Sequence, residues 1–339
     1  MASFTTNVVK SRETMNMGDT VMEFHAAQDP LRFVPDSNGL QQELRRVKAA
    51  RRADRVVALL LGAAALLSVC VTTAIVGILA TETFRFFQHV SVREFLTAKE
   101  WTPLFANARF GIAPLVLATA VTTGIALFLA IPLGTIIAIY LSEYASVRVR
   151  ELLKPTLELL SAVPTVVFGY FALLFVTPLL QRLYPGLSEF NMLSAGIVMG
   201  IMIIPYVSSL SEDAMHSVPM LLREGAYALG ANKLTTAVRV VIPAALSGIG
   251  AAYVLAVSRA IGETMIVAVA AGMQPRFTAN PAEGAATLTA YIVQVCLGDT
   301  PHGSVAYRSI FAAGATLFVL NLCFNMIAHY LRRRFREEY

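Results

Sequence analysis

Two charged residues interrupt a long apolar stretch in the C-terminal third of the chain. Arg259 and Glu263 are the only charged residues between positions 246 and 272. At a spacing of four residues, two side chains share one face of a helix and can form an ion pair. The planar guanidinium group also matches the oxygens of a phosphate-like anion in a bidentate manner. The pair therefore indicates either a binding site for an oxyanion or a salt bridge that stabilises a helix bundle.

The apolar surroundings of Arg259 and Glu263 limit where their side chains can lie. A charge at the centre of a membrane helix costs about 2.5–3.5 kcal/mol, so such residues rarely face lipid. We expect both to face a bundle interior or a wet cavity, where Glu263 would neutralise Arg259 while an anion path is empty and so permit release. Ser161 and Thr165, one turn apart in another apolar stretch, are further candidates for the path. Such hydroxyls more commonly hydrogen-bond to their own helix.

The segments that carry these residues are too apolar for a water-soluble domain. The chain of 339 residues is 56% hydrophobic and 14% charged, whereas soluble domains carry about 25% charged residues. Positions 56–80 hold 25 residues without a charge, and about 20 helical residues cross the hydrocarbon core of a bilayer. Backbone groups in lipid must be satisfied within their own segment, which favours helices over open strands. The sequence predicts an all-α membrane protein.

Six apolar stretches are long enough to cross a membrane as helices. The second contains Pro132, and its length requires that it tilt, kink or extend beyond the bilayer. Arg259 lies at the midpoint of the fifth stretch. The outer segment 273–307 is expected to be part of a docking surface or a flexible connector. The predicted spans are 55–82, 111–141, 155–180, 192–211, 246–272 and 308–331.

The distribution of basic residues predicts the orientation of these spans. With both termini cytoplasmic, 19 of the 27 Lys and Arg residues lie on the inside and 7 on the outside, as the positive-inside rule requires. The prediction divides the chain into a cytoplasmic N-terminal arm, 1–54, and a permease domain, 55–335. Within the arm, positions 40–53 form a basic amphipathic helix that either lies on anionic headgroups or is solvated.

Several functional classes are not indicated by the sequence. The net charge of +5 sits at positions that flank the spans, so it does not indicate nucleic-acid binding. The cysteines at 70, 296 and 323 have no metal-binding or redox spacing. The chain has no Gly-x-x-x-x-Gly-Lys-Ser/Thr loop that would bind nucleotide phosphates. We expect no metal site, no cofactor and no catalytic residue.

The segment 212–245, between the fourth and fifth spans, is predicted to form a helix–turn–helix on the cytoplasmic side. Gly230 and Asn232 permit a sharp turn, and Pro243 is expected to stop the second short helix. Apolar side chains at the tip have no lipid to contact, which indicates a docking surface for another protein. The alternative is a loop folded back on its own helices. The tip residues are Tyr227, Leu229, Ala231 and Leu234.

The same segment resembles the EAA motif of bacterial ABC importer permeases. That pattern is Glu-Ala-Ala, three residues, Gly, nine residues, then Ile-x-Leu-Pro. Here Glu224, Gly225 and Ala226 are followed at the same spacings by Gly230 and by Val240-Val241-Ile242-Pro243. The departures are Gly225 for Ala, and Val240 and Ile242 for Ile and Leu. The resemblance implies that this loop is the coupling helix that docks in a groove of a separate ATP-hydrolysing subunit.

Further stretches resemble the permeases of the Pst phosphate importers. The run from Ser258 to Met265 ends in Gly-Glu-Thr-Met, which is similar to the PstC-type subunit. The run Ser161 to Gly169, together with Trp101-x-Pro103 and Phe110-Gly111-Ile112-x-Pro114, is similar to the same family. The resemblance covers roughly residues 55–335.

The resemblance to Pst permeases implies a function and a set of partners. It implies a channel-forming, non-enzymatic subunit of an ATP-driven phosphate importer in a bacterial inner membrane. The partners would be a PstA-type permease, two PstB-type ATP-binding subunits and a periplasmic PstS-type phosphate-binding protein. In that role, Arg259 and Glu263 would belong to the substrate path. The alternatives are an ABC permease for another oxyanion and an ion-coupled secondary carrier, in which Glu263 would take up protons.

Overall fold

The computed structural model describes residues 37–105 and 107–334, and the side chains of residues 54–105 and 107–330. All extended regular elements in these ranges are helices, and an isolated antiparallel bridge joins Trp101 to Phe110. Six helical segments are long and apolar enough to cross a membrane, in agreement with the predicted all-α class. These are Asp54–Phe87, Ala113–Tyr144, Thr165–Leu183, Met192–His216, Lys233–Ile261 and Val305–Tyr330.

The first helix, α2 (Ser37–Phe87), belongs to both compact units of the chain, which divide between Ala74 and Ile75. In the first unit, positions 40–53 are helical as predicted and continue into the first span without a break. The predicted arm before Ser37 lies outside the described residues. In the second unit, the end of α2 is fixed by a hydrogen bond from Thr83 Oγ1 to the carbonyl of Phe311.

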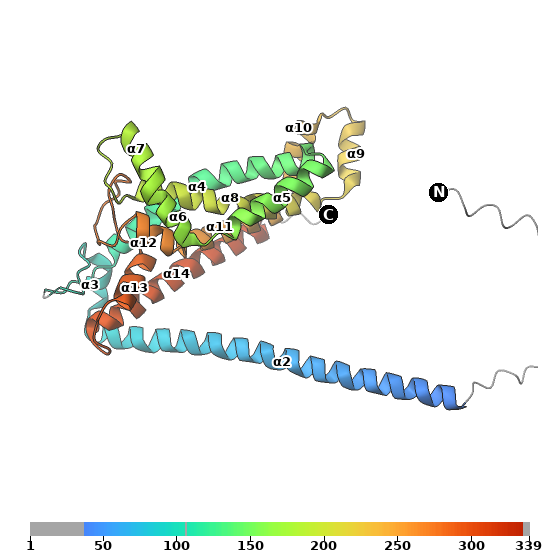
Figure 1. The fold of residues 1–339 in the computed structure, drawn as a ribbon, viewed down its shortest axis with the longest axis horizontal. Coiled ribbons are helices and arrows are strands. Elements are labelled where there is room, and N and C mark those ends of the chain that lie inside the picture. Colours follow the sequence, from blue (N-terminus) through green and yellow to red (C-terminus); the bar gives the residue numbers. More distant parts are fainter. Residues whose placement is uncertain (1–36, 106, 335–339) are drawn as a thin grey trace, which may run out of the picture. The chain divides into compact units, whose positions relative to one another are not determined.

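The centre of the second unit is the crossing of α4 (Ala113–Ile139) and α8 (Met192–His216), which lie side by side in Figure 1. Small residues allow these helices to approach closely. A Cβ at Gly196 would lie 2.7 Å from the Cβ of Ile125, and one at Gly200 would lie 2.9 Å from the carbonyl oxygen of Ala126. Small residues at such crossings are typical of helix packing in membranes. Pro132 lies within α4 without ending it.

The third predicted span, 155–180, is not one helix. An amphipathic helix, α5 (Val147–Ser161), contains Pro155 and ends before Pro164, where the backbone is extended. The chain then continues through α6 (Thr165–Phe171), the π-helical η2 (Ala172–Val176) and α7 (Thr177–Leu183). Proline lacks a backbone N–H and disfavours helix at the residue before it, which accounts for the break.

The fifth predicted span, 246–272, is wrong at both ends. The helix begins at α10 (Lys233–Thr236), continues through the π-helical η3 (Ala237–Val241), and becomes α11 (Ile242–Ile261). Pro243 therefore lies in the first turn of α11 and does not stop a helix, because an N–H in that turn needs no partner. After Ile261 the chain breaks before the short α12 (Met265–Ala270). Arg259 is in the last turn of α11 and not at the middle of a span.

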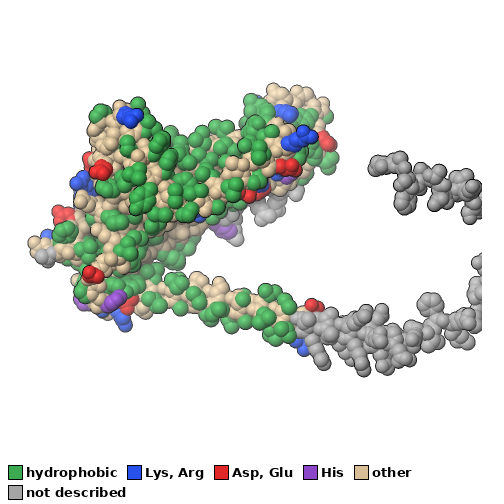
Figure 2. Space-filling view, in the orientation of Figure 1, with side chains coloured by type: hydrophobic (Ala, Val, Ile, Leu, Met, Phe, Trp, Pro, Cys, Tyr) green, Lys and Arg blue, Asp and Glu red, His purple; other side chains and the backbone are tan. Residues whose placement is uncertain are grey.

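Opposite ends of the second unit carry different features. At one end, α3 (Val92–Thr97), α13 (Leu288–Leu297) and the start of α14 (Val305–Arg334) surround buried aromatic rings, among them Trp101. At the other end, α9 (Met220–Ala228) and α10 form a projecting hairpin. On the face shown in Figure 2, charged side chains gather at these ends, and the surface between them is mainly hydrophobic. This distribution fits a bundle that crosses a membrane.

Candidate functional site

Arg259 lies against an aromatic ring instead of a carboxylate. Its guanidinium carbon is 4.2 Å from the centroid of the Tyr206 ring, on α8. Among the described side chains, no carboxylate forms an ion pair with Arg259, and its Nε atom is buried without a hydrogen-bond partner. An arginine stacked on a ring keeps the N–H groups along its edge free to donate. The arrangement suits recognition of an anion.

Glu263 does not pair with Arg259, contrary to the helical spacing of four residues. The helix ends between them, and Glu263 lies in the break between α11 and α12. Its Oε1 atom accepts hydrogen bonds from the backbone N–H groups of Met265 (3.1 Å) and Ile266 (3.3 Å). Its own carbonyl accepts a bond of 2.7 Å from Thr289 Oγ1, on α13. Glu263 therefore fixes the start of α12, which leaves Arg259 without an acidic partner.

The two hydroxyl candidates take different positions at the break between α5 and α6. Ser161 Oγ donates to the carbonyl of Glu158 in its own helix at 2.7 Å, which is the ordinary role of such a hydroxyl. Thr165 is the first residue of α6 and is partly buried. The carbonyl of Ser161 is 3.5 Å from the hydroxyl of Tyr206. The structure thus brings the backbone of Ser161 to the ring that supports Arg259.

Tyr206 is the residue that the sequence analysis missed at this site. It follows Pro205 within α8 and is 53 positions away from Arg259 in the chain. A tyrosine inside an apolar span could have drawn attention, because its hydroxyl requires a polar partner when buried. Its pairing with Arg259 depends on how α8 and α11 cross, and no local pattern encodes that crossing.

The predicted helix–turn–helix is present and its tip is exposed. Gly230 has a φ angle of +82°, a left-handed conformation that favours glycine, and Asn232 caps α10 through a bond from the N–H of Thr235. Leu229 is 91% exposed and Leu234 is 59% exposed. Tyr227, Glu224 and Gly225 are also exposed, whereas Ala226 and Ala231 are partly buried. The tip is not folded back on its own helices.

The base of this hairpin is held by a buried ion pair that the sequence analysis did not identify. Arg223, on α9, contacts Glu143 at 3.1 Å from Nη2 to Oε1. Glu143 belongs to the π-helical η1 (Tyr140–Tyr144), which extends α4. The two side chains are 9% and 3% exposed. The pair connects the hairpin to the end of α4.

A second charged cluster joins α5 to α8 near the same end. The predicted loop 212–245 begins too early, because α8 continues to His216 and Glu212 is fully buried within it. Glu212 pairs with Arg150 and Lys154 of α5, and Lys154 also pairs with Asp213. Burial lowers the pKa of Lys154, but its bonds with Asp213 and Glu212 outweigh this effect and raise the pKa above its usual value. The cluster holds α5 against α8.

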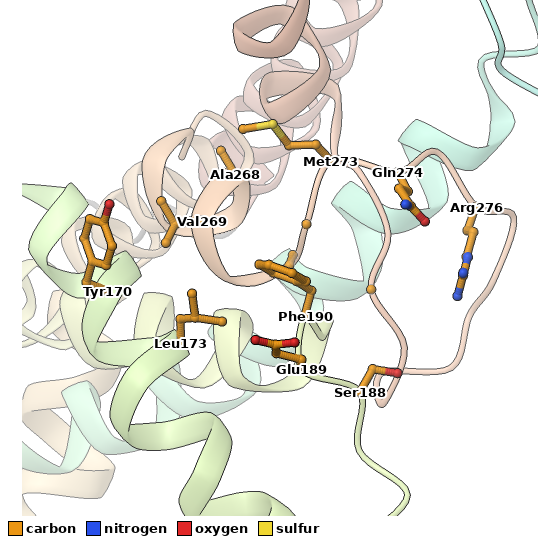
Figure 3. A pocket seen from close by; sticks show the side chains of 13 residues that line it. Tyr170, Leu173, Ser188, Glu189, Phe190, Ala268, Val269, Met273, Gln274 and Arg276 are labelled. Carbon is orange, nitrogen blue, oxygen red and sulfur yellow. The ribbon is translucent and has the colours of Figure 1, made fainter.

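A separate cavity of about 690 Å³ lies between α6, α12 and the loops beside them. None of the residues predicted for the substrate path lines it. Figure 3 shows Tyr170 and Leu173 on one side, with Gln274 and Arg276 on the loop after α12. A flexible connector was one of the two predictions for the segment 273–307. The segment contains α13, and the N–H of Ala286 donates to the carbonyl of Gln274. The cavity is therefore bounded by an ordered loop.

Known permease proteins are similar to this chain in sequence. Residues 130–337 match the model of the family described as binding-protein-dependent transport system inner membrane component. The chain is 33% identical over 274 residues to a probable ABC transporter permease protein, YqgH, of Bacillus subtilis strain 168, covering 80% of this chain and 88% of that protein. It is 31% identical to the phosphate transport system permease protein PstC of Mesorhizobium japonicum, covering 71% and 78%.

Solved structures are similar in fold. A bacterial ABC transporter involved in the import of the acidic polysaccharide alginate matches with a TM-score of 0.60 and 17% identity, over 86% of this chain and 100% of that chain. A complex of a bacterial alginate ABC transporter with its periplasmic protein contains a chain that matches with a TM-score of 0.58 and 19% identity, over 85% and 96%. At this identity the likeness shows the fold alone.

Proposed function

We propose that this chain, which belongs to the family of binding-protein-dependent transport system inner membrane components, forms part of the membrane path of an ATP-driven importer for inorganic phosphate. Membership of the family makes it a multi-pass permease subunit of an ABC importer, with ATP hydrolysis in a separate subunit. The substrate proposal rests on Arg259, a partly buried cation that stacks on Tyr206 and has no acidic partner among the described side chains. Similarity to PstC proteins supports phosphate as the anion.

The chemistry of Arg259 fits transient binding of an oxyanion. A guanidinium group held by a ring face can donate two parallel bonds to phosphate without first breaking an ion pair. The Tyr206 ring carries no negative charge that would repel the anion. Conduction requires a site whose affinity for the anion is high enough for entry and low enough for release. One such arginine per permease meets both requirements. Ser161 and Thr165 lie at the adjacent helix break and complete the proposed path.

The exposed hairpin is the proposed contact with the ATP-hydrolysing subunits. Its EAA-like residues lie at the end where basic residues predict the cytoplasm, and Leu229 and Leu234 offer apolar side chains to a groove. The proposed assembly contains this chain, a PstA-type permease, two PstB-type ATP-binding subunits and a periplasmic PstS-type protein, in a bacterial inner membrane with both termini cytoplasmic. The hairpin residues in this contact are Glu224, Gly225, Ala226, Tyr227, Leu229, Gly230, Ala231 and Leu234, with Pro243 at the start of α11.

Uptake of labelled phosphate by proteoliposomes that hold the complete assembly tests this proposal. Arg259→Gln is compared with wild type, and Arg182→Gln, at an exposed arginine of α7, serves as the matched control. We expect ATP-dependent uptake that Arg259→Gln abolishes and Arg182→Gln retains, with the complex intact in both. Full uptake by Arg259→Gln would remove Arg259 from the path.

The same vesicles separate the competing functions. ATP-driven uptake of sulfate instead of phosphate would keep the importer and change its substrate. Uptake that follows a proton gradient and ignores ATP would identify an ion-coupled carrier.

A further inference from the structure

We infer that the Arg223–Glu143 pair is a positioning contact that fixes the base of the α9–α10 hairpin to α4 and α8, so that movement of the hairpin is transmitted to both helices. The inference rests on the proposed function, because it takes the hairpin to be the surface that the ATP-hydrolysing subunit moves. Neither residue belongs to the EAA-like motif itself, although Arg223 directly precedes it.

The guanidinium group of Arg223 joins three segments of the chain. Its Nη1 atom donates to the carbonyl of Val218, in the turn after α8, at 2.6 Å. Its Nη2 atom donates to the carbonyl of Met215, in the last turn of α8, at 2.8 Å. Nη2 and Nε both donate to Glu143 Oε1, at 3.1 and 3.3 Å. One side chain from α9 therefore holds the end of α8 and the extension of α4 together.

The electrostatics of this contact explain why it is specific for arginine. The last carbonyls of a helix carry partial negative charge, so a cation beside the carbonyl of Met215, in the last turn of α8, is stabilised there. The guanidinium fork reaches this carbonyl, the carbonyl of Val218 and Glu143 at once. A lysine offers a single nitrogen instead of a fork, and it can retain the ion pair or the carbonyl bonds but not the full set.

The hairpin is fixed at its base and exposed at its tip, which is the arrangement expected of a lever. Around the ion pair, Val218 and Met215 pack with Ala138 of α4 and Val241 of η3 in a buried apolar cluster. Leu229, at the tip, is 91% exposed. A displacement of the tip by a docked partner therefore reaches the ends of α4 and α8 through the base, where the Arg223–Glu143 pair is the charged connection.

The test measures uptake and ATP hydrolysis in the same proteoliposomes with the complete assembly. The variants are Arg223→Lys and Glu143→Gln, which alter the pair with little change in side-chain size. Arg239→Lys and Glu151→Gln are the matched controls, since both residues are exposed on nearby elements. We expect assembled complex and ATP hydrolysis to be retained, while phosphate uptake per ATP hydrolysed falls about tenfold in both pair variants and not in the controls. The double variant should lower the ratio less than the two single effects combined, because both single variants weaken the same Arg223–Glu143 contact.

Two results would overturn the inference. One is an unchanged ratio of uptake to ATP hydrolysis in both pair variants. The other is a loss of assembled complex that accounts for all lost uptake at a constant ratio, which would make the pair purely structural.

The wild-type vesicles report on the proposed function separately. If they import sulfate instead of phosphate, the substrate proposal fails and the same ratio is measured with sulfate. If their uptake ignores ATP, the proposed function fails and this inference fails with it.

Discussion

Arg223 and Arg259 are in opposite circumstances, although the first is buried and the second partly buried. Arg223, at the base of the hairpin, donates to a carboxylate and two backbone carbonyls. Arg259, at the end of α11, stacks on Tyr206, and its Nε atom is buried without a partner. Both occupy sites where an unpartnered charge is expensive. The bonds of Arg223 connect the hairpin to α4 and α8, whereas the N–H groups of Arg259 that lack a protein acceptor are available to a ligand.

The neighbouring carboxylates follow the same division. Glu143 is used as a counter-ion, within 3.1 Å of Arg223. Glu263 is four residues from Arg259, yet its Oε1 atom accepts hydrogen bonds from two backbone N–H groups of α12. The spacing of four residues predicts an ion pair between Arg259 and Glu263, but the structure has one between Arg223 and Glu143 instead. Variants of Arg223, Arg259, Tyr206 and Glu263 test this contrast.

Arg223→Ala is expected to destabilise the folded protein far more than Arg259→Ala. Removal of Arg223 leaves Glu143 buried and unpaired, and breaking one partner of a buried ion pair costs about 3–5 kcal/mol. Loss of Arg259 removes a cation–π contact, which is worth about 0.5–2 kcal/mol. Thermal unfolding of the purified complex, with Arg239→Ala as the control, measures both. Equal destabilisation by the two variants would show that Arg223 and Arg259 contribute equally to the stability of the folded protein.

Arg259→Lys is expected to lower phosphate uptake strongly while leaving stability near that of wild type. Lysine keeps the charge but has no planar fork for bidentate bonds, and the loss of one such charged hydrogen bond corresponds to about 1.5–3 kcal/mol. The rate of labelled phosphate uptake per assembled complex gives the effect. Uptake at the wild-type rate would mean that only the charge matters.

Tyr206→Leu is expected to raise the KM for uptake, and Tyr206→Phe to leave it nearly unchanged. Phenylalanine keeps the ring beneath Arg259, whereas leucine removes a cation–π contact of about 0.5–2 kcal/mol. The hydroxyl lies 3.5 Å from the carbonyl of Ser161, so little is lost with it. Initial uptake rates over a range of phosphate concentrations separate KM from the maximal rate. A KM raised equally in both variants would assign the role to the hydroxyl.

Glu263→Gln is expected to have the smallest effect. The amide oxygen of glutamine can still accept from Met265 N and Ile266 N, so only the charged character of two bonds is lost, at a cost of about 1 kcal/mol. Uptake should stay within a few-fold of wild type across the pH range of the assay. A large fall, or a newly pH-independent uptake, would show that Glu263 acts as counter-ion or proton acceptor after all.

The sequence predicted the elements better than the contacts between them. Apolar length was sufficient to predict the number of spans, because in lipid the backbone has few alternatives, but it misplaced the third and fifth. The hairpin followed from Gly230 and Asn232, whose turn chemistry is local. Prolines were less informative, since Pro132, Pro155 and Pro205 lie inside helices and Pro164 accompanies a break. Neighbouring packing decides which of these outcomes a proline produces.

The composition of the candidate site depended on helix crossings that no local pattern encodes. Arg259 was identified because a charge in an apolar stretch is conspicuous. Tyr206, the side chain on which Arg259 stacks, was not identified. The break after Ile261 separates Arg259 from Glu263, and the approach of α8 brings Tyr206 to Arg259. The sequence analysis did not single out Arg223, and only the π-helical extension of α4 brings Glu143 to it.

The π-helical segment η1 makes the Arg223–Glu143 contact sensitive to the number of residues as well as to their identity. A π turn accommodates one residue more than an α-helical turn, and here the N–H of Ala145 donates to the carbonyl of Tyr140, five positions back. Deleting a single codon within 140–142 would restore a regular helix and rotate Glu143 by about 100° around its axis. A shortened gene could therefore preserve every amino acid at the contact and still disconnect the hairpin from the helix it is proposed to drive.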